Sequence, residues 1–297
     1  MATIRIFGKN IYYEVYGEQH DRTLVYFHGG PGASCLDFAA QARELGRQVR
    51  VILFDQYGVL RSDPVAEEEP YGMVMQAAMI EEMRRLLHVE QWSVLGHSYG
   101  GMLACLYART YPSAVSKLIL DCPSLDFVDS ARSIARYMSG YIAAHGSDDA
   151  KALVVKMQSA PYAGTAVVDD LLALLGHIHD MQLRNYLHGV TFEEYAKVAY
   201  TESFPEEMWR RSQTHLEKLI GEGKMLESFL PMLKEISAPI LLVNGLYDPA
   251  CSDSQIRYIR EHIPNARQVL FENSGHFPRI EEAAKYTQCV LDFLTQP

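Results

Sequence analysis

The sequence of 297 residues contains no hydrophobic run long enough to cross a membrane. Apolar stretches such as residues 51–54 and 240–243 fall far short of the roughly 20 residues that a spanning helix requires. The N-terminal residues hold no basic segment that leads into an apolar one, so we expect no secretory signal peptide. These absences predict a cytoplasmic protein that does not act at a membrane.

Cysteine is scarce, with five residues in the whole chain. Their number is odd, their spacing is wide, and no C-x-x-C pair occurs. This usage argues against a disulfide framework and against a thiolate metal site, and it is typical of a reducing compartment. We therefore expect no metal centre built on Cys35, Cys105, Cys122, Cys251 or Cys289.

Basic residues are also fewer than acidic ones: the chain has 27 Lys and Arg and 37 Asp and Glu, which gives a formal net charge of −10. No block of Lys or Arg is present that would follow a phosphate backbone, which disfavours nucleic-acid binding. Neither a phosphate-binding loop nor a dinucleotide fingerprint occurs, so we predict no cofactor. The expected partner is a small molecule or a short peptide.

What the sequence does contain is an alternation of short β-branched runs with longer amphipathic segments. This pattern predicts an α/β fold with a mostly parallel sheet and helices on both faces. Helices are expected at residues 35–46, 73–88 and 99–111. The strands expected in this part are 4–7, 11–16, 24–27, 49–54, 92–95 and 118–120.

The pattern changes between residues 123 and 237, which lack strand-like runs and are rich in helix formers, Met and Tyr. After Pro239 the alternation resumes, and the expected elements are strand 240–243, helix 253–263, strand 267–271 and helix 280–294. We interpret this as a core domain built on the sheet, residues 1–122 and 238–297, interrupted by a helical cap, residues 123–237.

The strongest chemical signal is the segment 96–101, which reads Gly-His-Ser-Tyr-Gly-Gly and matches G-x-S-x-G. It lies between an expected strand and an expected helix, where a nucleophile can stand on a tight turn with small neighbours. The helix N-terminus behind it favours developing negative charge. This context predicts Ser98 as a nucleophile.

A glycine-rich segment, residues 28–32, reads His-Gly-Gly-Pro-Gly and directly follows an expected strand. An oxyanion hole needs backbone N–H groups that point at one spot, and glycines permit the required turn. We predict that the Gly30 and Tyr99 N–H groups form this hole and that Gly29 lies against the substrate.

Two further loops follow strands near the end of the chain, at residues 244–248 and 273–277. The carboxyl ends of strands are where an open α/β sheet gathers its site. The chain order Ser98, Asp248, His276 is that of the α/β-hydrolase triad. We predict His276 as the base and Asp248 as the residue that orients it.

These motifs, with the Asp-Gln-Tyr-Gly of residues 55–58, resemble those of the proline iminopeptidase family of α/β-hydrolases. The resemblance implies hydrolysis of the bond after a small N-terminal residue, with cap carboxylates that hold the free ammonium. Pro249 stands where some members carry Glu, Tyr57 stands where many carry Arg, and the W-x-x-W-E cap motif is absent. The candidate cap carboxylates are Glu193, Glu194, Glu202, Glu206 and Glu207.

The sequence leaves three functions open. An aminopeptidase or amidase is the first, an esterase or lactonase with an apolar acyl pocket is the second, and a ligand-binding protein that keeps its triad is the third. A Ser at position 98 disfavours dehalogenases and epoxide hydrolases, which use a carboxylate nucleophile.

Two groups of polar residues are interpreted as non-catalytic. His177, His179 and Asp180 suggest a metal site, but histidines at i and i+2 point to different faces of a helix, so we expect none. Asp55 and Arg61 are expected to stabilise a loop beside the site through polar contacts.

Overall fold

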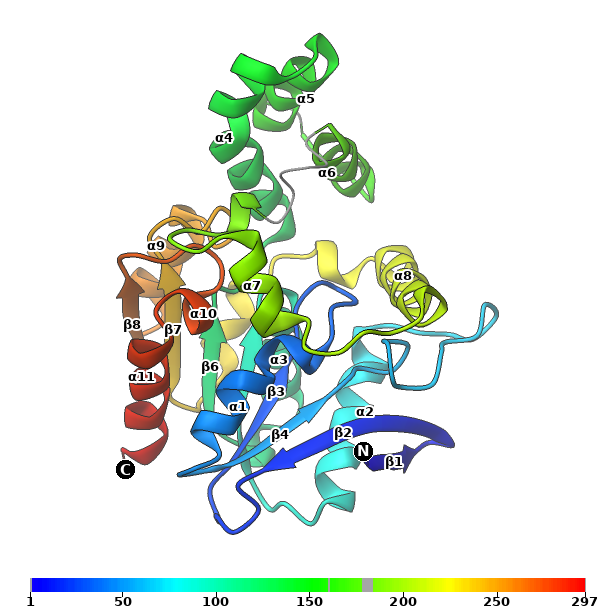
Figure 1. The fold of residues 1–297 in the computed structure, drawn as a ribbon, viewed down its shortest axis with the longest axis vertical. Helices are drawn as coiled ribbons and strands as arrows, with labels where there is room; N and C mark the ends of the chain where they lie inside the picture. Colours follow the sequence, from blue (N-terminus) through cyan, green and yellow to red (C-terminus); the bar gives the residue numbers. More distant parts are fainter. Residues whose placement is uncertain (1, 160, 178–183, 297) are drawn as a thin grey trace.

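A computed structural model describes residues 2–159, 161–177 and 184–296 and places an eight-stranded sheet at the centre of the molecule (Figure 1). The strand order is β1-β2-β4-β3-β5-β6-β7-β8, with β1 and β2 antiparallel to their neighbours and the other strands parallel. The predicted fold class is therefore confirmed. The strands are β1 (Ala2–Ile6), β2 (Lys9–Tyr16), β3 (Thr23–Phe27), β4 (Arg50–Phe54), β5 (Trp92–His97), β6 (Val115–Asp121), β7 (Ile240–Gly245) and β8 (Ala266–Phe271).

Helices cover both faces of the sheet, which explains why its inner strands are continuous apolar runs rather than alternating ones. On one face α1 (Ala39–Leu45) and α11 (Ala283–Thr295) pack in a shared hydrophobic cluster. On the other face lie α2 (Met73–Leu86), α3 (Tyr99–Thr110) and α9 (Asp253–His262).

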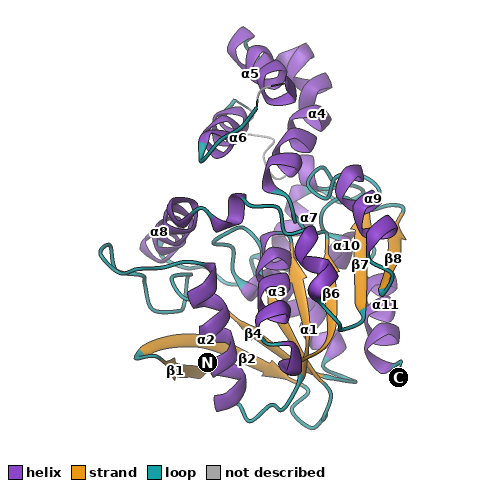
Figure 2. Cartoon of the chain, turned by 180° about the vertical axis from the view of Figure 1, so that it is seen from behind, coloured by secondary structure: helices purple, strands orange, loops and turns teal. Residues whose placement is uncertain are grey.

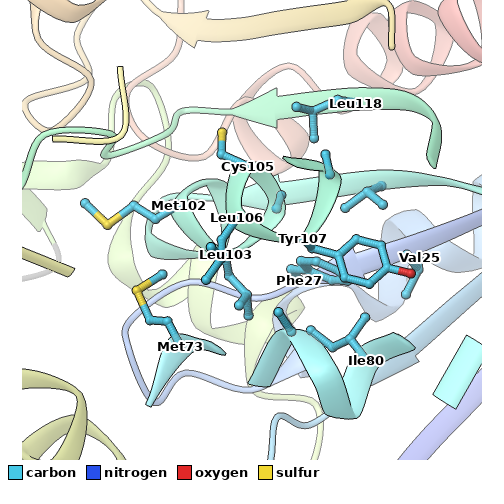
Figure 3. Close-up of a cluster of buried hydrophobic side chains, with 14 of the residues drawn as sticks. Val25, Phe27, Met73, Ile80, Met102, Leu103, Cys105, Leu106, Tyr107 and Leu118 are labelled. Atoms are coloured by element: carbon cyan, nitrogen blue, oxygen red, sulfur yellow. The ribbon is translucent and has the colours of Figure 1, made fainter. Parts of the chain in front are cut away.

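Helix α3 is the most deeply buried of these helices, and Figure 3 shows its side chains at the centre of the larger cluster. Tyr107 meets the ring of Phe27 edge to face, with 5.8 Å between ring centroids. Leu103 and Leu106 complete the packing toward α2. Because α3 starts directly after β5, this packing fixes the turn that carries Ser98.

A helical insertion separates β6 from β7 and lies beyond the carboxyl ends of the strands (Figures 1 and 2). Its first three helices share a hydrophobic cluster of their own, which explains how they stand away from the sheet. No strand occurs in its described part. The boundaries 123 and 237 remain a prediction. The helices are α4 (Phe127–His145), α5 (Asp148–Ser159), α6 (Ala166–Gly176), α7 (Phe192–Ala199) and α8 (Glu206–Glu222).

Two expected helices are each split in the structure. Residues 35–46 begin as a 3₁₀ turn, η1 (Cys35–Phe38), before α1 starts. The expected helix 280–294 consists of α10 (Pro278–Glu281) and α11, with non-helical backbone at Glu282. The Glu282 carboxylate accepts hydrogen bonds from the Asn273 N–H and the Ser274 hydroxyl, which tie this junction to the loop before His276. Within the described residues, no helix combines the length and apolarity needed to span a membrane.

Candidate active site

Ser98 occupies the tight turn between β5 and α3. Its φ of 54° and ψ of −121° are unfavourable for a residue with a side chain, so the surrounding packing must hold it there. A Cβ at Gly100 would clash with the carbonyl oxygen of Phe27, which explains why the turn needs glycine. Ser98 is partly exposed, lies at the N-terminus of α3 and lines a cavity. The strained turn thus presents the hydroxyl-bearing residue to this cavity.

Asp248 and His276 come together from the loops after β7 and β8. Oδ1 of Asp248 lies 2.9 Å from Nδ1 of His276, and the Ala250 N–H donates to the same oxygen at 2.8 Å. A carboxylate beside Nδ1 favours the tautomer with the proton on Nδ1 and leaves Nε2 as the basic nitrogen. His276 lines the same cavity as Ser98, so the predicted base and nucleophile face one space.

The predicted oxyanion donors also lie at this cavity. Gly30 and Tyr99 both line it, and within the described part of the chain neither backbone N–H donates to a protein acceptor. Gly29 borders Ser98, since a Cβ on Gly29 would lie 3.0 Å from the Ser98 Cβ. The two N–H groups are thus available to a negative oxygen.

A buried ion pair supports the glycine-rich loop from behind. Asp55 accepts from the Ser34 hydroxyl at 2.6 Å and from the Cys35 N–H at 3.1 Å. Arg61 donates from Nε to Asp55 at 2.7 Å. Burial alone would raise the pKa of Asp55, but the hydrogen bond and charge of Arg61 outweigh it and lower that pKa. These contacts agree with the expected stabilising role of Asp55 and Arg61.

The loop that carries His276 is held by the cap as well as by the core. The carbonyl of Tyr186 accepts the His276 N–H at 2.7 Å. Glu281 accepts the Gly275 N–H at 2.8 Å, the Phe277 N–H at 3.1 Å and also the His188 N–H. Burial raises the pKa of Glu281 to about 7. Sequence reasoning missed these contacts, because nothing near residues 186–188 marks them as neighbours of His276.

The cavity has a volume of about 410 Å³ and is lined mostly by apolar side chains. Ser124, Ser130 and four tyrosines are among its lining residues, and Asp37 of η1 is the one carboxylate among those that the structure describes. The cap helices α4, α6 and α8 supply much of the apolar surface, through Phe127, Ala131, Ile134, Val168, Leu171, Leu172, Leu175 and Leu216.

The five cap glutamates proposed from the sequence are not among the residues that line this cavity. All are exposed: Glu202 lies in the loop between α7 and α8, and the other four lie on helices that turn their apolar faces inward. Glu194 forms a capping box with Thr191, its carboxylate accepting the Thr191 N–H at 2.8 Å. The structure therefore does not bring Glu193, Glu194, Glu202, Glu206 or Glu207 to Ser98.

A buried charged cluster underlies the wall of the cavity. Arg279 donates from Nη2 to Asp37 at 2.6 Å and from Nη1 to Asp121 at 3.2 Å. Nδ1 of His97 lies 3.3 Å from the Asp121 carboxylate. Burial and the charge of Arg279 lower the pKa of His97 to about 4, so this imidazole is neutral at pH 7. Sequence reasoning missed the cluster, although a lone Asp in the apolar run 35–38 was a signal.

One group of described residues has ligand atoms close enough together to hold a metal: Cys122, Asp248 and His276, within 4.8 Å of one another. Two of the three are the hydrogen-bonded pair already described. Burial raises the pKa of the Cys122 thiol well above its ordinary value. In the other candidate metal group, His179 and Asp180 lie outside the described residues.

The chain is similar to known proteins over nearly its whole length. The proline iminopeptidase of Saccharolobus solfataricus is 28% identical over 98% of this chain and 91% of its own length. The crystal structure of VinJ superposes with a TM-score of 0.74 at 19% identity, over 99% of this chain and 97% of that one. The proline iminopeptidase of Mycobacterium smegmatis superposes with a TM-score of 0.71 at 21% identity, with the same coverage. Residues 22–283 match the α/β hydrolase fold family, and the chain belongs to that family.

Proposed function

We propose that the protein is a serine hydrolase with Ser98 as nucleophile, His276 as general base and Asp248 as the residue that orients His276. One observation carries the proposal: Ser98 stands on a strained turn at a cavity that it shares with His276, whose Nδ1 lies 2.9 Å from Asp248. The family match supports it, because this fold presents a nucleophile at that turn.

The reaction is acyl transfer through a covalent intermediate. Ser98 attacks a carbonyl carbon while His276 takes the hydroxyl proton, and the oxyanion accepts hydrogen bonds from the Gly30 and Tyr99 N–H groups. Loss of one such donor typically raises the barrier by about 3 kcal/mol. His276 then protonates the leaving group, and a water activated by the same imidazole releases the acid and restores Ser98.

For the substrate we propose an amide of a small molecule or short peptide with a free amine, as in an aminopeptidase or amidase. The support is the set of relatives named proline iminopeptidase, which match nearly the whole chain. The cavity volume of about 410 Å³ limits the bound portion to a few residues. A folded polypeptide does not fit beneath the cap.

An ester or lactone with an apolar acyl group is the second candidate. The specific observation in its favour is the apolar lining supplied by α4, α6 and α8. An apolar wall binds an acyl chain without requiring an amine.

Five free cysteines support our proposal that the protein works in a reducing compartment, the cytoplasm. The buried thiols of Cys35, Cys105, Cys122 and Cys251 have pKa values raised by burial, which leaves them protonated and chemically quiet.

The test compares wild type with Ser98→Ala on three chromogenic substrates: a prolyl arylamide, its N-acetylated form and a short-chain acyl ester. We expect wild type to cleave the free-amine substrate much faster than the acetylated one, and Ser98→Ala to abolish the activity. Turnover of the ester alone would keep the serine mechanism and discard the peptidase proposal. If wild type and Ser98→Ala behave alike on all three, the hydrolase proposal fails for these substrates and a ligand-binding role takes its place.

A further inference from the structure

Recognition of a substrate amine requires a negative group at the cavity, and the structure offers one in an unexpected place. The five glutamates expected to serve this purpose are exposed elsewhere on the cap. Among the lining residues that the structure describes, Asp37 is the one carboxylate and none is Lys or Arg. Asp37 also forms an ion pair with the buried Arg279.

The single positive charge of Arg279 does not balance the negative charges around it. Arg279 carries one positive charge and contacts two carboxylates, Asp37 and Asp121. Burial alone would raise the pKa of Asp121, but the hydrogen bond from His97 and nearby positive charge lower it, so Asp121 is ionised. His97 is neutral, and the hydroxyls of Tyr26 and Tyr286 have pKa values raised well above 10 by burial. The cluster therefore has a net charge of about −1.

Asp37 is the charged residue of this cluster that is exposed to the cavity. Arg279 and Asp121 are completely buried, whereas the side chain of Asp37 is 11% exposed and faces the cavity. Asp37 accepts one hydrogen bond from Tyr26 at 3.0 Å and one from Arg279, which leaves acceptor capacity on its two oxygens. A buried charge that lacks a full counter-charge favours a cation at its exposed side.

We propose that Asp37 is a specificity-determining residue that binds the ammonium group of the substrate, with its charge reinforced by the Asp37–Arg279–Asp121 cluster. This inference rests on the proposed hydrolase function for its link to turnover, but it concerns binding. It places recognition of the amine on the core, in η1 directly after the glycine-rich loop, and not on the cap glutamates.

Aromatic rings from α7 and its following loop complete this end of the cavity. Helix α7 packs on η1, and Tyr195, Tyr200 and Phe277 line the cavity with Asp37. Burial and then the charge of Asp37 raise the pKa values of Tyr195 and Tyr200, which places both rings within the field of that carboxylate. A carboxylate beside aromatic rings suits an alkylammonium, which gains charge contact and cation–π contact together. The apolar side chains of α4 and α6 line other parts of the cavity and suit an uncharged group.

The experiment uses two arylamides of the same shape, prolyl and cyclopentanecarbonyl, which differ in the charged amine. We expect wild type to prefer the prolyl compound in kcat/KM, and Asp37→Asn to lower this preference about tenfold or more, as for loss of one charged hydrogen bond. Asp37→Glu keeps the charge and should retain the preference. Glu207→Gln removes one carboxylate charge outside the cavity and is the matched control, so its preference should stay within about twofold of wild type. The Asp37→Asn substitution keeps the shape and an acceptor oxygen, and thermal unfolding checks that the variant folds.

Binding to Ser98→Ala separates failure of this proposal from failure of the hydrolase proposal. Calorimetry should show prolinamide binding about tenfold tighter than cyclopentanecarboxamide, with the difference lost in Ser98→Ala/Asp37→Asn. That result supports the ammonium site even if neither arylamide is hydrolysed. Equal binding of the two amides to Ser98→Ala, or a preference that survives Asp37→Asn, overturns it. A preference lost in Glu207→Gln would also overturn it, in favour of the cap.

Discussion

The carboxyl edge of the sheet and the helical cap differ in how closely their glycines are packed. At the edge, a Cβ on Gly100 would meet the Phe27 backbone, and one on Gly245 would meet the backbone of the His276 loop. In the cap, a Cβ on Gly140 or Gly221 would have open space within 4 Å. These two edge positions therefore leave no room for a side chain, whereas Gly140 and Gly221 of the cap do. A substitution at either edge glycine should therefore disturb the backbone around Ser98 or His276, whereas one at Gly140 or Gly221 should not.

The largest expected effect is loss of the Asp248 charge, which tests whether the edge carries the chemistry. Asp248→Asn leaves the shape but permits the wrong imidazole tautomer at His276, so we expect kcat to fall about 10⁴-fold. Steady-state kinetics on the best substrate of the panel measures it. Asp253→Asn, an exposed carboxylate nearby, is the control and should change kcat less than about twofold. A loss below about tenfold for Asp248→Asn would remove Asp248 from the mechanism.

The next effect compares packing in the two regions directly. Gly100→Ala forces backbone apart beneath Ser98, and we expect the free energy of unfolding to fall by about 3 kcal/mol or more. Urea denaturation measures the change. Gly140→Ala, at an exposed position inside α4, should instead raise stability by about 0.5–1 kcal/mol, since alanine restricts the unfolded chain. Similar destabilisation by both variants would contradict the difference in tolerance.

A smaller effect concerns Glu281, where the two regions meet. Its pKa is raised from an ordinary value of 4.5 to about 7 by burial, so the ionised form is disfavoured in the folded protein. The contribution of Glu281 to the free energy of unfolding is therefore largest below pH 4.5. As the pH rises to about 7, this contribution is lost, which lowers the free energy of unfolding by up to about 3 kcal/mol. Glu281→Gln cannot ionise and should lack this fall. Thermal unfolding from about pH 4 to 8 measures both slopes.

Glu282 provides a control of opposite sign for the same measurement. Burial would raise its pKa, but hydrogen bonds from Ser274 and Asn273 outweigh this and lower it. Its contribution to stability is present above pH 4.5 and is lost as the pH falls through its folded-state pKa. Glu282→Gln should therefore be less stable than wild type above pH 4.5 and lack the loss on the acid side, while the slope between about pH 5 and 7 stays as in wild type. Identical profiles for Glu281→Gln and wild type would exclude the assigned role of Glu281.

The elements at the carboxyl edge of the sheet can be predicted because they leave short motifs in the sequence. Ser98 needs small neighbours at fixed offsets, and Asp248 and His276 each follow a strand within a few residues. All eight strands were therefore predictable, and with them the fold class. The cap lacks such constraints, because its residues reach the cavity through helix packing over long sequence separations. The acidic residues of α7 and α8 look suited to bind an amine, yet amphipathic helices turn them outward.

The segment that joins Tyr186 to His188 has a consequence for protein engineering. Its carbonyl and N–H groups are bonded to the His276 loop and to Glu281, and the ring of His188 stacks on Tyr247, next to Asp248, with 3.5 Å between centroids. An exchange of the whole insertion for that of a relative would therefore cut contacts to the loops that carry Asp248 and His276. Chimeras should instead take their crossover points within α4 to α6 and keep residues 185–189 from this chain. Libraries that recombine substrate pockets would then preserve turnover, because the graft stops short of the groups that hold the imidazole.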